Sequence, residues 1–217
     1  MPITILHARG SSLCKSFQLA DGKPIKQELL HPRYFRLETY EASNLEQLSA
    51  LLLRLEDDPS RLIIRDQALD GVDVTHPVRR KKADALRPTQ EAPFVDKPIS
   101  WLMLDVDKQP LPPDIDLVAQ PLEAIEHLIT QLPVEFHNCS IHYQLSGSAG
   151  VNYVDRVSAH LVFWLDKPTT SARLKEWAKA VNSEHRLIDD ALFNPVQPHY
   201  TSKPSFPNGY TDPFAGR

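Results

Sequence analysis

The segment ISWLMLDVDKQP, residues 99–110, constrains the fold of this chain more than any other feature. Its apolar first half is typical of a buried strand, yet Asp105 and Asp107 follow two residues apart. Side chains at positions i and i+2 of a strand share a face, so the two carboxylates are expected to lie side by side. Neighbouring carboxylates on a half-buried surface repel each other and lose hydration, which is unfavourable unless a cation lies between them. The segment therefore predicts a strand that ends in a cation-binding pair.

The composition is that of an ordinary globular protein, with 41% hydrophobic and 24% charged residues among 217. A net charge of -4 argues against a protein that coats nucleic acid by bulk charge, although a local basic strip beside an acidic centre remains compatible with a nucleic-acid enzyme. Two cysteines, Cys14 and Cys139, provide no disulfide framework, which fits a reducing cytoplasm. No apolar run is long enough to span a bilayer, so we expect a cytoplasmic protein without membrane contact.

Strand and helix patterns alternate along the chain and predict an α+β or mixed α/β architecture. The Asp-Gly pair in ADGKP predicts a hairpin, and YFRLETYE is expected to continue its sheet. Leucines at helical spacing after Ser43 or Asn44 predict the first helix. Residues 70–98, polar and rich in proline, are expected to form a long loop. The other expected strands are 3–7, 13–19, 61–66, 139–145 and 157–168, and the other expected helices are 121–133 and 171–186.

Two later segments carry polar side chains that could complete a site with the acidic pair. Ser158 and His160 share a face of the strand VSAHLVF, and Asp189 and Asp190 follow a helix. Taken singly, each has a simple structural explanation: a turn at a strand end, a core histidine, a helix N-cap. Taken together, the carboxylates suit Mg²⁺, because proteins bind this ion through carboxylate oxygens and substrate phosphates. Two such ions can support nucleotidyl transfer.

These features, in this order, resemble the three motifs of the archaeo-eukaryotic primase superfamily, in particular the primase-polymerases of plasmids, phages and integrated elements. The motifs are WLMLDVD, SAH and LID. Two flanking segments, YQLSGSAGV and FNPVQPHYTSKPSF, are also similar to that branch. RLIIRDQAL resembles a strand that usually carries Ile-Arg-Gly, but Asp66 stands where glycine is expected, which leaves Arg65 a weak candidate.

The resemblance implies the archaeo-eukaryotic primase fold: an N-terminal α/β unit, about residues 1–98, packed on an RRM-like sheet unit, about residues 99–217, with the active cleft between them. It implies that Asp105, Asp107 and Asp189 bind two Mg²⁺ or Mn²⁺ ions. It also implies that His160 contacts the triphosphate of the incoming nucleotide, with Ser158 of the same motif as a further nucleotide-binding residue. The family pattern places a hydrophobic residue before the third acid, which favours Asp189 over Asp190 because Ile188 precedes it.

Small and aromatic residues near the motifs are further candidates for nucleotide contact. Ser146 and Ser148 lie in a Ser/Gly loop that either approaches phosphate or sugar or simply joins two strands. Gln197, His199 and Tyr200 either stack on nucleotide or template or pack in the core.

The basic strip Arg79, Arg80, Lys81 and Lys82 is a candidate for binding nucleic-acid phosphates, with a solvated loop as the alternative. A zinc site of His137, Cys139 and His142 is disfavoured, because strand alternation would place His142 on the opposite face from the other two.

We therefore expect a primase/polymerase catalytic domain that transfers nucleotides from (d)NTPs, on a single-stranded DNA template, to make or extend primers for a mobile element. The alternatives are a non-catalytic replication-initiator module that binds nucleic acid, and a metal-dependent nuclease. The turn-like final segment, PNGYTDPFAGR, indicates a fragment of a longer protein, and the resemblance implies a helicase domain or subunit after it.

Overall fold

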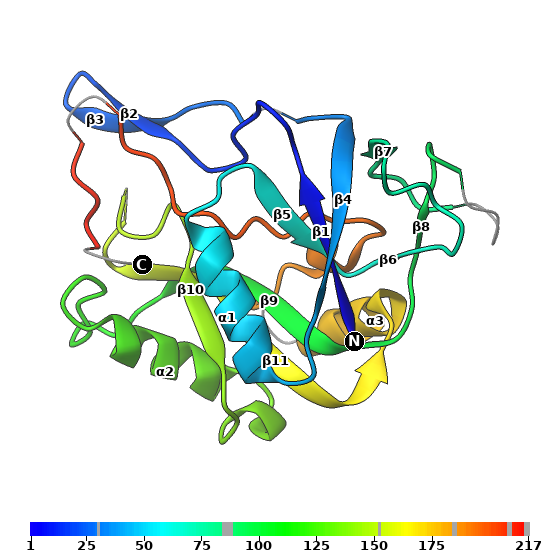
Figure 1. Cartoon of the computed structure of the whole chain (residues 1–217). Coiled ribbons are helices and arrows are strands. Elements are labelled where there is room, and N and C mark those ends of the chain that lie inside the picture. The colour runs from blue at the N-terminus through cyan, green and yellow to red at the C-terminus, as the bar shows by residue number, and fades with distance from the viewer. Residues whose placement is uncertain (30, 84–88, 152, 184–185, 208–209, 215–217) are drawn as a thin grey trace.

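The computed structural model describes residues 1–29, 31–83, 89–151, 153–183, 186–207 and 210–214. The protein is a mixed α and β structure with antiparallel sheets, which confirms the coarse α+β expectation (Figure 1). None of the helices within these residues is long and apolar enough to cross a membrane.

The N-terminal sheet has four strands in the order β5-β1-β4-β7. Its strands are β1 (Pro2–His7), β4 (Tyr34–Glu41), β5 (Arg61–Ile64) and β7 (Val78–Arg79). Helix α1 (Leu45–Glu56) begins as expected at Asn44, whose side chain accepts a hydrogen bond from the Gln47 N–H at 2.9 Å. Four of its six leucines, Leu48, Leu51, Leu52 and Leu55, are buried at helical spacing, so the periodicity that predicted the helix is the one that fixes its packed face.

The expected hairpin forms, but it stands apart from the N-terminal sheet. Strands β2 (Phe17–Ala20) and β3 (Lys23–Lys26) pair only with each other among the described strands. Asp21 and Gly22 both have positive φ, 51° and 73°, as a two-residue turn of the mirror-image type requires. The expectation that Tyr34–Glu41 continues the hairpin sheet is wrong, because β4 pairs with β1 and β7 instead.

The expected long loop over residues 70–98 is also wrong in part. It contains β7 and β8 (Phe94–Val95), and β8 pairs with β6 (Gln67–Ala68). Strands of two residues are too short to show the alternation by which a strand is recognised in a sequence.

The second sheet has three strands in the order β10-β11-β9. They are β9 (Ile99–Pro110), β10 (His142–Leu145) and β11 (Arg156–Thr169). One face packs on α2 (Pro121–Gln131) and α3 (Ser171–Val181) through Leu102, Leu104, Leu161 and Phe163. Two short 3-10 turns complete this half, η1 (Val134–Phe136) and η2 (Asp190–Phe193).

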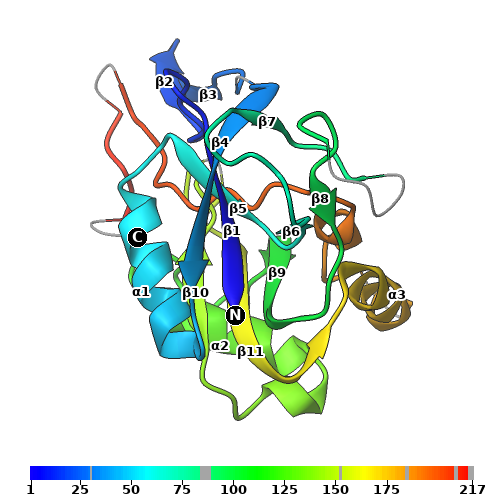
Figure 2. The same cartoon turned by 45° about the vertical axis from the view of Figure 1, so that its right-hand side comes forward.

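The opposite face of the second sheet packs on the N-terminal half. Trp101 and Met103 of β9 and Val162 of β11 form one apolar cluster with the leucines of α1 and with Ile63 of β5. Figures 1 and 2 show α1 and the N-terminal sheet covering this side of β9 and β11. Side chains from both sides of the proposed division at residue 98 therefore share one core, and the division itself stays a sequence prediction.

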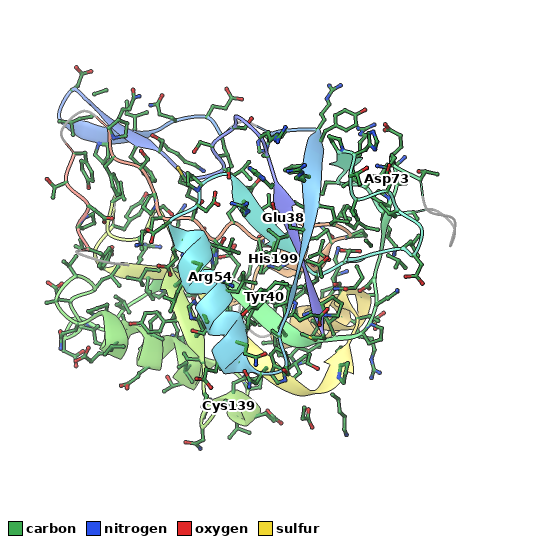
Figure 3. All side chains as sticks on the ribbon, in the orientation of Figure 1. Glu38, Tyr40, Arg54, Asp73, Cys139 and His199 are labelled. Carbon is green, nitrogen blue, oxygen red and sulfur yellow. The ribbon has the colours of Figure 1, made fainter. Side chains whose placement is uncertain are left out.

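The segment after η2 returns to the N-terminal half. The backbone N–H of Ile63 donates to the carbonyl of His199, the His199 N–H donates back to Ile63, and the Phe17 N–H donates to the carbonyl of Ser205. His199 consequently lies in the middle of the molecule (Figure 3). This return brings residues from both ends of the chain to the end of β9.

Candidate functional site

A row of polar side chains crosses the second sheet where its apolar face ends. Gln144 of β10 lies opposite His160 of β11, and His160 lies opposite Asp105 of β9. Asp105 is two residues beyond Met103, so alternation places it on the face that Trp101 and Met103 direct into the shared core. The buried strand predicted from residues 99–110 is thus confirmed, and its acids lie at the end of an apolar surface.

A β-bulge orients the second acid. Two residues of β9, Asp107 and Lys108, lie opposite the single residue Ser158, and Lys108 takes a positive φ of 52°. The buried Ser158 hydroxyl donates to Asp107 Oδ1 at 2.7 Å and accepts from the Lys108 N–H at 2.8 Å. Ser158 therefore holds the bulge and the carboxylate together, while its expected contact with a nucleotide stays a prediction.

The third acid lies beside the first. The Asp189 N–H donates to the Asp105 carbonyl at 2.9 Å, and Asp189 Oδ1 accepts from the Ala191 N–H at 3.1 Å. Asn182 fixes the approach, because its side chain bonds both to the backbone N–H and to the carbonyl of Ile188. Asp189 contributes to the pockets described below and Asp190 does not, which agrees with the preference for Asp189.

Burial sets the protonation behaviour of this cluster. Desolvation raises the pKa of Asp105, and the nearby carboxylates of Asp189 and Asp107 add to the increase, whereas His160 and Lys15 oppose it. Desolvation lowers the pKa of His160, and Lys15 adds to that effect, although Asp105 opposes it. His160 Nε2 lies 3.6 Å from Asp105 Oδ1, which is too long for a hydrogen bond. The site thus combines a carboxylate that resists ionisation with an imidazole that resists protonation.

Two adjoining pockets share Lys15, Asp105 and Asp189 in their walls. The first, named here the His160 pocket, has a volume of about 200 Å³ and is also lined by His160, His199, Tyr200 and Lys203. The second, the Asp107 pocket, has a volume of about 380 Å³. Its other walls come from Asp107, Ser158, Ser146, Ser148, Lys26, Lys108, Tyr153 and Arg156. The expected residues Gln197, His199 and Tyr200 therefore lie at the His160 pocket, and both loop serines lie at the Asp107 pocket.

Lys15 is the site residue that sequence reasoning missed. Its Nζ donates to Ser146 Oγ at 2.9 Å, and Ser146 Oγ lies 3.3 Å from Ser148 Oγ. Lys15 reaches the site because the Ser205 N–H donates to its carbonyl, so residues from the two ends of the chain hold it in place. No local motif marks such a lysine, and only the tertiary fold reveals it.

The basic strip does not line either pocket, although Arg80 is close enough to Tyr200 of the His160 pocket to interact with it electrostatically. Arg79 forms an ion pair with Glu91 at 3.1 Å, and Arg80 donates to the Val196 carbonyl. Burial lowers the pKa of Arg80. Lys81 and Lys82 are exposed, and none of the four lines either pocket. Two of the four side chains thus have partners within the protein, and phosphate binding by the strip stays a prediction.

Arg65 is a structural residue rather than a pocket residue. It is 2% exposed, its Nη2 donates to the Thr169 carbonyl at 2.7 Å, and its guanidinium lies 5.1 Å from the Trp101 ring centroid. Burial lowers its pKa to about 10, although Asp96 and Asp66 oppose this effect. Arg65 therefore ties the N-terminal sheet to the start of α3.

The possible zinc ligands bond elsewhere. His137 Nε2 bonds to the Leu132 carbonyl, the Cys139 thiol donates to the Glu135 carbonyl, and His142 Nδ1 bonds to the Ser49 hydroxyl. Cys139 lies at the outer edge of the molecule (Figure 3). The three side chains have separate structural roles.

The chemistry of the acidic cluster fits a hard divalent cation. Asp105, Asp107 and Asp189 offer only oxygen ligands, as Mg²⁺ and Mn²⁺ prefer. Within the described residues, no three His, Cys, Asp or Glu side chains already form a metal-binding group. Asp107 and Asp189 instead accept hydrogen bonds from Ser158 and Ala191. An ion held here would therefore take further ligands from water or from substrate phosphates.

Comparison with known protein families, curated proteins and solved structures found no match to this chain.

Proposed function

We propose that this chain is the catalytic domain of a DNA primase-polymerase of the archaeo-eukaryotic primase superfamily. The observation that carries the proposal is the cross-strand pairing of Asp105 with His160, together with the backbone bond from Asp189 to Asp105. Residues from three motifs far apart in the sequence thus meet in one row at two pockets. A chance combination of three short motifs would not be expected to converge in this way.

The connectivity of the second sheet also supports this proposal. The succession β9-α2-β10-β11-α3, with strand order β10-β11-β9, is that of the first five elements of a βαββαβ unit such as an RNA-recognition fold. In such a unit the fourth strand would lie beside β9, on the side away from β11. Asp189 bonds to β9 after α3, at the place where that strand would run.

In this proposal, the side chains of the two pockets have different roles in template-directed nucleotidyl transfer. His160, Lys203 and Tyr200 offer hydrogen-bond donors to a polyphosphate in the His160 pocket, and Lys15 stands between the two pockets. Asp105, Asp107 and Asp189 would hold Mg²⁺ or Mn²⁺, which supplies activation of the attacking hydroxyl and stabilisation of the leaving pyrophosphate. Ser158 orients Asp107, and Asn182 orients the segment that carries Asp189.

A neutral His160 imidazole suits contact with the phosphates of a nucleotide. A neutral His160 can donate one hydrogen bond to a phosphate oxygen without adding charge that would compete with the metal. Its Nδ1 is buried and has no hydrogen-bond partner within the described part of the chain.

The decisive experiment incubates the protein with labelled nucleotides, single-stranded DNA and Mn²⁺ or Mg²⁺, and sizes the products on a gel. Asp105→Asn and Asp107→Asn are expected to abolish incorporation. Asp190→Asn is the matched control, because Asp190 neighbours the site without lining either pocket, and it is expected to retain activity.

The other outcomes distinguish the alternatives. Degradation of the template would indicate a metal-dependent nuclease. Metal-independent DNA binding without incorporation would indicate an initiator-type binding module. Retention of primer synthesis by either aspartate variant would refute the proposed site. A helicase domain or subunit as partner belongs to the same proposal.

A further inference from the structure

The rim of the Asp107 pocket carries an exposed aromatic side chain next to a cation. Tyr153 is 52% exposed, and the Arg156 guanidinium carbon lies 5.9 Å from the centroid of its ring. Both residues line the pocket that contains Asp107. Exposed aromatic side chains are a recurrent platform on which unpaired bases stack, and a neighbouring arginine adds cation–π contacts.

We propose that the Asp107 pocket and its rim bind the single-stranded nucleic acid on which the acidic cluster acts, with Tyr153 and Arg156 stacking on a base. The inference rests on the proposed function, because it assumes that the acids act at the end of a strand. It assigns strand binding to this surface rather than to the basic strip at Arg79.

The charge of the pocket suits a phosphate backbone. Four cations, Lys15, Lys26, Lys108 and Arg156, line it against three carboxylates. A divalent cation at the carboxylates would leave the walls clearly positive. Phosphate contacts of this kind dominate the affinity of proteins for single strands.

The cations of the pocket belong to separate elements of the fold. Lys26 ends the β3 strand of the hairpin, Lys108 lies in the bulge of β9, and Arg156 begins β11. Figures 1 and 2 show the hairpin next to the segment that follows residue 200. Phe206 of that segment stacks on Phe17 with ring centroids 5.7 Å apart, which holds the hairpin beside the pocket.

This distribution favours a strand over a nucleoside triphosphate as the occupant. A triphosphate is compact and is the better match for the smaller neighbouring pocket, which His160, Tyr200 and Lys203 line. A strand repeats its charges along its length and exposes bases between them, so it needs dispersed cations and an aromatic face. The Asp107 pocket has both.

The test measures binding of a fluorescein-labelled oligothymidylate by fluorescence anisotropy, in buffer that contains Ca²⁺ in place of Mg²⁺ and no nucleotide. Tyr153→Ala is expected to raise the Kd for the oligonucleotide about five- to a hundredfold, because one stacked base is lost. Tyr153→Phe keeps the ring and is expected to bind like the unmodified protein. Val154→Ala, at the exposed neighbouring residue, is the control for loop perturbation.

The salt dependence of oligonucleotide binding tests the phosphate contact expected of Lys26 in the hairpin. Lys26→Ala is expected to reduce the slope of log K against log salt by about 0.7, as loss of one phosphate contact on a single strand requires. Lys23→Ala is the matched control, because Lys23 is on the same strand, faces the other way and does not line the pocket. Its salt slope is expected to be unchanged.

The outcomes separate this inference from the proposed function. Unchanged oligonucleotide affinity in both Tyr153→Ala and Lys26→Ala would overturn the strand surface, even if the protein synthesises primers. Loss of affinity for a fluorescent ATP analogue with Mg²⁺ in these variants, with oligonucleotide binding intact, would also overturn it by making the Asp107 pocket a nucleotide site. Reduced oligonucleotide affinity in both variants would support the surface, whether or not the protein incorporates nucleotides.

Discussion

Replacing Ser158 by alanine tests the bulge that orients Asp107. The change removes two hydrogen bonds, one of 2.7 Å to the Asp107 carboxylate and one of 2.8 Å from the Lys108 N–H. Each is worth about 1 kcal/mol, since the exposed Asp107 carboxylate can replace its bond with water. The free energy of unfolding should therefore fall by about 2 kcal/mol, which for a chain of this length lowers Tm by about 4–8 °C.

Ser158→Ala should also slow catalysis, because it removes the hydrogen bond that positions the Asp107 carboxylate. With Asp107 no longer held, we expect kcat to fall about ten- to a hundredfold, while KM for the nucleotide changes little. Thermal melts and steady-state primer extension measure the two effects. Ser183→Ala, an exposed serine after α3, is the control for removing a hydroxyl.

Two results would contradict this account. An unchanged Tm would mean that the two hydrogen bonds do not stabilise the bulge. A raised KM with unchanged kcat would mean that the Ser158 hydroxyl contacts the nucleotide, as its place in the second motif implies, and not the carboxylate.

Three further predictions concern stability. Burial raises the pKa of Glu56, an effect that Lys203 partly opposes, so the stability that protonated Glu56 contributes is lost as pH rises through that pKa. Glu56→Gln should therefore raise Tm at neutral pH but not at acid pH, and a difference in Tm that does not depend on pH would refute this. Gly150→Ala should lower the free energy of unfolding by about 2–5 kcal/mol, because φ is 68° and the new Cβ would lie 2.8 Å from the Phe214 ring. Gly22→Ala, which also has a positive φ but no neighbouring atom within 4 Å, should lower it by only about 1–2 kcal/mol, and equal losses in denaturant melts would contradict the clash. Asn44→Ala should lower the free energy of unfolding by about 1 kcal/mol through the lost cap of α1, and an unchanged denaturation midpoint would argue against that cap.

Local patterns in the sequence were sufficient for the main elements. The leucines of α1 and the Asp-Gly turn of the hairpin specify their own geometry over a few residues, because periodicity and turn chemistry act locally. The same reasoning failed for β7 and β8 and for the pairing of β4. Those pairings depend on which strand lies alongside, and nothing within a strand encodes its neighbour.

The candidate site shows the same division. Residues 99–110 alone determined a buried strand that presents Asp105 and Asp107 at its end, since alternation and apolar burial are properties of a single segment. The direct pairing with His160, the bulge that turns Asp107 toward Ser158, and the arrival of Lys15 and Asp189 were decided only by the tertiary structure. The physical reason is that these contacts join residues far apart in the chain, and only packing of the two sheets around one core sets their register.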